Sequence, residues 1–122
     1  MITQNELGKY VLSQEVTGII RRIPIESRGI SKGGREWVLG KVVLEVYEEG
    51  KEGSAQIYLT TFDEELTEMI QMLGVGKRVV VQFHIDVKEF YDSYRINLIL
   101  DSISGMNENE DYVYGTKKGD ER

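Results

Sequence analysis

The sequence contains no cysteine, one proline and a single histidine, His84. The lack of cysteine excludes disulfides, thiolate zinc sites and cysteine nucleophiles, and one histidine cannot build a multi-histidine metal centre. No segment approaches the roughly 20 apolar residues of a membrane span, and the first six residues lack the basic and then apolar pattern of a secretion signal. We therefore expect a cytoplasmic protein with no membrane contact, no metal and no other cofactor.

The length of 122 residues, of which 40% are hydrophobic, suits one compact domain that builds its core without a covalent crosslink. The net charge of -6 argues against binding to nucleic acid by bulk charge. The charge is unevenly distributed, however, with six basic and two acidic side chains in residues 16–41, and one basic and eight acidic side chains in residues 45–68. This asymmetry predicts a basic face on an acidic body.

Glycine, with 13 residues, separates segments that are rich in valine, isoleucine and tyrosine, which is a β pattern. We expect strands over residues 16–25, 36–47, 55–61, 78–88 and 94–104. Their alternation predicts that one row of each strand faces the core. These rows are Val38, Val42, Leu44 and Val46; Ile57 and Leu59; Val79, Val81, Phe83, Ile85 and Val87; and Ile96, Leu98 and Leu100.

Two connections are distinctive. Residues 27–35 hold three glycines and three basic side chains, so we expect a mobile surface loop. Thr61 and Glu64 have the spacing of a capping box, and the apolar residues after them recur at helical intervals until Gly74. The sequence therefore predicts one short amphipathic helix between the third and fourth strands.

The ends of the chain differ from its centre. Residues 1–14 form an N-terminal extension with enough apolar side chains for either a helical turn or an added strand, and the sequence does not decide between them. The apolar periodicity stops at Gly105, so we expect a disordered acidic tail over residues 105–122. The folded domain is expected to span residues 15–104.

Three strands, a helix and a final long hairpin are the element order of an OB-fold, a five-stranded Greek-key barrel that binds oligonucleotides or oligosaccharides. An SH3-like barrel would lack the helix, and a ferredoxin-like fold would need a helix after its first strand. The prediction is an all-β fold with one short helix.

The same stretch resembles a small bacterial family of uncharacterised OB-fold proteins that are similar to single-stranded DNA-binding proteins. The resemblance covers residues 16–104. It is carried by Gly34-Arg35-Glu36-Trp37, Val43-Leu44-Glu45, Gly76-Lys77-Arg78-Val79-Val80-Val81 and Phe83-His84-Ile85-Asp86-Val87-Lys88-Glu89-Phe90-Tyr91. It implies an OB-fold and a protein that binds single-stranded DNA.

Binding of a single strand needs cations that follow the phosphates and flat side chains on which bases stack. By strand parity, several side chains point from the second and third strands to the face that OB-folds use for ligands, and others come from the first loop and the last hairpin. The predicted contacts are Trp37, Lys41 and Tyr58 on the strands; Arg28, Lys32 and Arg35 in the loop; and Tyr91, Tyr94 and Arg95 in the hairpin. The alternative for Trp37 is a cap on the open end of the barrel, and tyrosine is also favoured in strands regardless of function.

No catalytic or metal-binding constellation is found. Gly29, Gly33 and Gly34 lack the spacing and the Lys-Ser/Thr of a phosphate loop. The acidic residues 63–68 suit the start of a helix, where carboxylates interact favourably with the helix dipole. His84 has no nucleophile partner and is expected to face solvent, so we predict that the protein is not an enzyme.

The sequence therefore predicts binding of single-stranded DNA with little sequence preference, and RNA is an open alternative. The competing prediction is a protein-interaction or homo-oligomerisation barrel, in which Trp37, Leu39 and Val43 form an apolar patch.

Overall fold

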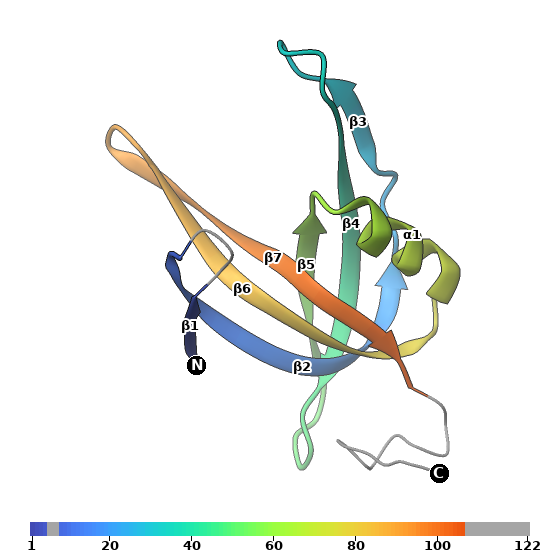
Figure 1. The fold of residues 1–122 in the computed structure, drawn as a ribbon. Helices are drawn as coiled ribbons and strands as arrows, with labels where there is room; N and C mark the ends of the chain where they lie inside the picture. The colour runs from blue at the N-terminus through green and yellow to red at the C-terminus, as the bar shows by residue number, and fades with distance from the viewer. Residues whose placement is uncertain (5–7, 107–122) are drawn as a thin grey trace.

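The computed structural model describes residues 1–4 and 8–106, which form one sheet of seven strands and one helix (Figure 1). In chain order the elements are β1 (Ile2–Gln4), β2 (Tyr10–Arg22), β3 (Ser27–Ile30), β4 (Glu36–Tyr47), β5 (Ser54–Thr61), α1 (Glu64–Leu73), β6 (Arg78–Phe90) and β7 (Ser93–Gly105). Within these described ranges, no helix is long and apolar enough to cross a membrane.

Five of the strands close into a ring. The order along the sheet is β1-β2-β6-β7-β5-β4-β3, and an additional pairing of β2 with β4 joins the two ends of the five central strands. All pairings around the ring are antiparallel except the short parallel contact of β5 with β7 at Thr60 and Ile99. This ring, with its helix between the third and fourth barrel strands, confirms the predicted OB-fold.

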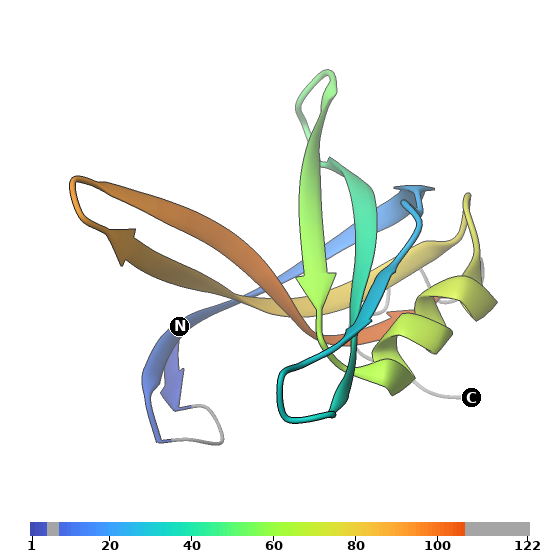
Figure 2. The same cartoon turned by 90° about the horizontal axis from the view of Figure 1, so that it is seen from above.

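The core fills the ring as the alternation predicts. Its buried members are Ile20, Val42, Leu44, Leu59, Ile70, Val79, Val81, Phe83, Leu100 and Ile103. Two residues expected in the core, Val87 and Ile96, are instead more than half exposed. They lie opposite each other in the β6–β7 hairpin, which extends far beyond the ring (Figures 1 and 2), so the barrel cannot cover them.

Val43 is a second departure from the expected pattern, because it is only 4% exposed although it belongs to the outward row of β4. It lies opposite Tyr58 on β5, and a β-bulge between Ile20 and Arg22 brings Arg22 opposite it on β2. Directly opposed residues share a face of the sheet, so these two long side chains flank Val43. The predicted apolar patch of Trp37, Leu39 and Val43 is therefore not exposed as a unit.

The N-terminal segment adds a strand, which decides between the two possibilities that the sequence left open. β1 pairs with the beginning of β2, from Ile2 opposite Leu12 to Gln4 opposite Tyr10. β2 thus begins six residues earlier than expected and ends at Arg22, before Pro24. The division of the chain at residue 15 stays a prediction, and most of the predicted tail, residues 107–122, lies outside the described residues.

Part of the expected loop at residues 27–35 is a strand, and that expectation was wrong. Residues 27–30 form β3, which pairs with the beginning of β4. Gly29 was interpreted as a sign of flexibility, but it faces Trp37, and a Cβ at this glycine would lie 2.5 Å from Cζ2 of the indole ring. This glycine therefore makes room for a tryptophan, and only residues 31–35 form the turn.

The helix ends where the sequence predicts, but its N-cap is a different residue from the one that the sequence predicts. Asp63, not Thr61, is the N-cap, and its Oδ1 accepts a hydrogen bond from the backbone N–H of Leu66 at 3.0 Å. Thr61 is the buried last residue of β5, and its Oγ1 accepts from the N–H of Asp63. At the other end, Gly74 has a φ of +82°, which favours glycine, and its N–H donates to the carbonyl of Ile70.

Candidate nucleic-acid interface

Two hairpins border the outer face of β4 and β5. The β3–β4 turn and the tip of the β6–β7 hairpin lie at the same end of the barrel in Figure 1, and the β4–β5 loop lies at the opposite end. The predicted contacts fall on three parts of this region, namely the face itself, the β3–β4 hairpin and the β6–β7 hairpin. The fold thus brings distant parts of the sequence to one side of the molecule.

Trp37 and Lys41 on β4 and Tyr58 on the neighbouring β5 all lie on the outer face of the sheet. Strand register places Lys41 opposite Thr60, and Val43 opposite Tyr58, so Lys41 and Tyr58 share a face. Trp37 belongs to the same row of β4 as Lys41. The structure therefore places these three predicted residues on one side of the sheet.

Trp37 is 40% exposed and is not part of the core. Its indole ring lies over Gly29 of β3, the residue directly opposite in register. A shallow depression of about 290 Å³ is formed there by Arg28, Gly29, Ile30, Glu36 and Trp37. The ring is thus positioned by the β3–β4 hairpin and is partly open to a ligand.

Lys41 and Tyr58 differ in how they are held. The ammonium of Lys41 donates a hydrogen bond to Ser27 Oγ at 3.0 Å, which ties the half-buried lysine to β3. Tyr58 is half exposed and borders a groove of about 330 Å³ between β5 and β7. This groove combines apolar walls with two side-chain amides, and it is lined by Gln56, Ile57, Tyr58, Thr60, Ile96, Asn97 and Leu98. Such a surface can accept a base and hydrogen bond to its edge.

Arg28 was predicted to contact phosphate, but the structure engages it in ion pairs. Its two terminal nitrogens donate to the two carboxylate oxygens of Glu64 at 3.0 and 2.9 Å, and Nε donates to Glu26 at 3.3 Å. These hydrogen bonds lower the pKa of Glu64 and raise that of Arg28. The guanidinium therefore links β3 to the first turn of α1, and a phosphate would have to displace Glu64 to reach it.

Substitution of Glu64 by glutamine should reduce the pH dependence of stability in acid. The pKa of Glu64 is below its ordinary value of 4.5 in the folded protein, so the unfolded chain binds more protons as the pH falls through this window. The contribution of the pair is complete above pH 4.5 and is lost as the pH falls through the lowered pKa. Urea unfolding from pH 7 to pH 3 should show a steeper acid loss in the wild type than in Glu64→Gln. Glu65→Gln, in the same helical turn, is the control, and an equal change in both variants would contradict the assignment.

The other two basic residues of this hairpin, Lys32 and Arg35, are exposed in the turn. The turn is ordered by backbone hydrogen bonds from Ser31 to the carbonyl of Arg35 and from Gly34 to the carbonyl of Ser31. In the part of the chain that the structure describes, neither basic side chain forms an ion pair. They remain available to phosphate, unlike Arg28.

The β6–β7 hairpin separates its predicted contacts. Its two-residue turn places Tyr91 at the tip with a φ of +52° and a fully exposed ring. Tyr94 shares a face with Ile96, which continues the core row, whereas Arg95 belongs to the opposite face. The Arg95 guanidinium lies 5.7 Å from the centre of the Phe90 ring. The structure thus does not bring Arg95 to the same face as Tyr94.

The sequence interpretation missed two candidate residues, Arg22 and Phe90. The β-bulge in β2 puts Arg22 beside Val43 on the outer face, while Arg21 lies 4.0 Å from Glu45 of that same row. Strict alternation would point these two adjacent arginines to opposite sides of the strand. Phe90 is about half exposed near the hairpin tip, and its place in the alternating pattern gave no sign of this.

His84 is mostly covered, contrary to the expectation that it faces solvent. Its side chain is 16% exposed, and Nδ1 lies 2.9 Å from a carboxylate oxygen of Asp101 on the neighbouring strand. The pair links β6 to β7. Among residues 1–4 and 8–106, no three histidine, aspartate or glutamate side chains are grouped so that they could hold a metal ion.

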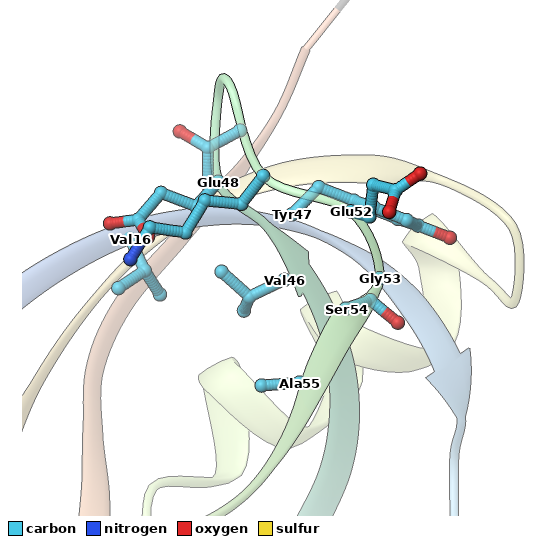
Figure 3. Close-up of a pocket in the computed structure, with 10 residues that line it drawn as sticks. Val16, Val46, Tyr47, Glu48, Glu52, Gly53, Ser54 and Ala55 are labelled. Carbon is cyan, nitrogen blue, oxygen red and sulfur yellow. The ribbon is translucent and has the colours of Figure 1, made fainter.

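A larger depression of about 510 Å³ lies between β2 and the β4–β5 loop (Figure 3). Val16, Val46 and Ala55 form its apolar floor, and Glu48 and Glu52 lie at its rim. The nearby Lys51 is paired with Glu48 at 3.2 Å. An acidic rim repels phosphate, and this depression lies at the end of β4 opposite Trp37, so it is not part of the candidate interface.

Comparison with solved structures identifies the architecture. Rim1, a mitochondrial single-stranded DNA-binding protein of S. cerevisiae, superposes with a TM-score of 0.59 and 13% identity over 79% of this chain and 96% of Rim1. The chain shares the fold of single-stranded DNA-binding proteins. SSBb, the second such protein of Mycobacterium smegmatis, gives a TM-score of 0.54 and 18% identity over 78% of this chain and 88% of SSBb. No protein-family model matches the sequence, and neither does any curated protein.

Proposed function

We propose that this OB-fold binds single-stranded DNA with little sequence preference, as a non-enzymatic cytoplasmic protein. The observation that carries the proposal is the position of Trp37 and Tyr58, which are both partly exposed on the outer face of β4 and β5 between two projecting hairpins. Flat side chains in such an arrangement offer a stacking platform to any base, because every base has a π-face. The fold that the chain shares with Rim1 and SSBb supports the same function.

Each part of the interface has its own role in this proposal. Trp37 and Tyr58 stack on bases along the outer face, Tyr91 adds a ring at the tip of the β6–β7 hairpin, and Tyr94 adds one on the face of that hairpin that continues the core row. Lys32 and Arg35 bind phosphates from the β3–β4 turn. Lys41 and Arg28 shape the surface through Ser27 and Glu64, and Arg95 supports the hairpin over Phe90.

The charge distribution suits a localised interface. Although the chain carries a net charge of -6, the β3–β4 turn presents two cations that form no ion pair with any described residue, and the acidic residues of the β4–β5 loop lie at the far end of the barrel. A strand that entered from the acidic end would be repelled. The phosphates are therefore directed to the end that carries both hairpins.

The deciding experiment follows the fluorescence of the single tryptophan, Trp37, during titration with a thymidine oligomer of about 20 nucleotides. Quenching should saturate and weaken with added salt, since phosphate binding releases counterions. Lys32→Ala/Arg35→Ala should reduce the slope of log K against log salt by about 1.4, because each lost contact to a single strand removes about 0.7.

Lys51→Ala, in the acidic β4–β5 loop, is the matched control and should leave that slope unchanged. Competition with a uridine oligomer of the same length compares RNA with DNA. The absence of quenching at low salt would refute the proposal and favour a protein-interaction barrel. An unchanged slope in the double variant would remove the β3–β4 turn from the interface.

A further inference from the structure

The outer side of α1 carries an apolar surface that the barrel does not use. The side chains that face inward from this helix include Thr67 and Ile70, both buried. Four large apolar residues on this helix or beside its ends are exposed instead, namely Phe62 at 66%, Met69 at 41%, Met72 at 86% and Val75 at 66%.

We call these four residues the apolar strip, with two of them on the helix and one beside each of its ends. Met69 and Met72 are three positions apart and therefore lie on the same face. Phe62 stands just before the N-cap Asp63, and Val75 follows the C-terminal Gly74. Phe62 would be fixed by the fold if it packed on an apolar residue in the second helical turn, as in a hydrophobic staple, but Thr67 occupies that position. A hydrophobic staple therefore does not account for Phe62.

Every charged side chain of α1 itself is negative. Glu65 and Glu68 are exposed and lie one turn or less from Met69 and Met72, and the last turn of α1 contains no basic residue. Glu64, on the side towards β3, is already paired with Arg28. Exposed methionines adapt to different apolar partners, and the carboxylates add a demand for positive charge.

We propose that the outer face of α1, formed by Phe62, Glu65, Glu68, Met69, Met72 and Val75, binds a basic segment of another protein that also presents apolar side chains on one face. Leucine-like side chains of that segment would lie on the two methionines, and its lysines or arginines would pair with Glu65 and Glu68. A second copy of this face would bring like charges together, and the same carboxylates repel nucleic acid and anionic membranes.

This surface does not overlap the candidate nucleic-acid interface at the β6–β7 hairpin. In both Figure 1 and Figure 2, α1 lies on the opposite side of the barrel from the tip of that hairpin. The strip also consists of residues that the proposed DNA interface does not use. A bound basic protein and a bound single strand are thus compatible, and failure of one proposal leaves the other intact.

The four methionines of the chain give a direct test by NMR of their labelled methyl groups, because Met69 and Met72 are in the strip while Met1 and the buried Met106 are not. The full chain is titrated with a synthetic helical peptide of about 15 residues, with leucines on one face and lysines flanking them. We expect the Met69 and Met72 signals to shift and saturate, and those of Met1 and Met106 to stay in place. A peptide of the same composition with its leucines scattered should bind more weakly.

Charge reversal tests the recognition independently of packing. Glu65→Lys/Glu68→Lys should weaken peptide binding at least about tenfold, equivalent to about 1.4 kcal/mol, whereas Glu48→Lys/Glu52→Lys makes the same change of net charge in the distant β4–β5 loop and should have little effect. Equal weakening in both double variants would overturn the proposal, as would the absence of any shift. Shifts of Met69 and Met72 on addition of the thymidine oligomer, or on raising the protein concentration alone, would assign the face to DNA or to a second copy and would also overturn it.

Discussion

Replacement of Trp37 by alanine is expected to weaken binding of a thymidine oligomer by about 5- to 150-fold, which corresponds to the roughly 1 to 3 kcal/mol that one stacked base contributes. The indole ring is 40% exposed, lies over a glycine and does not belong to the core. Its removal therefore takes away a stacking surface while the buried side chains of the core remain in place.

Since this variant has no tryptophan fluorescence, its affinity is measured by the anisotropy of a labelled oligonucleotide. Trp37→Phe keeps a flat ring and should lose less affinity than Trp37→Ala. Circular dichroism and thermal unfolding establish whether each variant is folded. If Trp37→Ala unfolds the domain, the residue is part of the structure that closes the barrel, and the stacking role is wrong.

A second variant moves the ring without removing it. A Cβ at Gly29 would lie within 3.0 Å of three atoms of the indole, so Gly29→Ala must displace the side chain. The expected result is a changed emission spectrum of Trp37 together with weaker binding of the oligomer. Unchanged affinity after a clear spectral change would show that the position of the ring is unimportant for the ligand.

The period of the strands and the ends of the helix could be predicted from the sequence because both depend on local chemistry. Alternating valine, isoleucine and leucine define which face of a strand is buried, so Val42, Leu59 and Val81 were placed correctly in the core. The end of the helix at Gly74 could be predicted as well, because helices commonly end at a residue with positive φ and glycine adopts this conformation most readily. The element order then led to the OB-fold.

The details of the candidate interface were less accessible, since they depend on contacts between distant residues. The pairing of Arg28 with Glu64 joins residues that are 36 positions apart, and no local pattern indicates it. The bulge that turns Arg22 to the outer face arises in the pairing of β2 with β4. The exposure of Val87 and Ile96 depends on how far the β6–β7 hairpin extends past the ring, which alternation does not specify.

Gly29 shows how the same residue type supports two interpretations. In the sequence it stands near Gly33, Gly34 and several polar residues, and this composition of residues 27–35 indicates a flexible loop. In the structure it is a strand residue whose missing side chain accommodates Trp37. The position of the tryptophan opposite this glycine is a tertiary fact, so the sequence could nominate Trp37 as a contact without revealing what holds it in place.

Substitution of Gly40 by alanine is expected to lower the free energy of unfolding by about 1 to 3 kcal/mol, a typical cost of overpacking a core. Gly40 is buried in β4 where the strand meets α1, and an added Cβ would lie 2.3 Å from Oγ1 of Thr67 and 3.0 Å from its Cβ. Thr67 cannot easily move, because it is buried and its hydroxyl donates to the carbonyl of Asp63 at 2.9 Å. Urea unfolding measures the loss, and Gly33→Ala, with no atom within 4 Å of its added Cβ, is the control that should change stability little.

A double-mutant cycle distinguishes this contact from a general intolerance of alanine at residue 40. Thr67→Ala removes the hydroxyl, which approaches closest, and the methyl group at 3.1 Å, so Gly40→Ala should cost less in that background, with a coupling of about 0.5 to 3 kcal/mol. Additive effects would mean that the helix does not press on β4 at this point. Since β4 also carries Trp37 and the first turn of α1 holds Arg28 through Glu64, a helix displaced by Gly40→Ala should also weaken binding of the oligomer. Thr67→Ala should restore part of both losses.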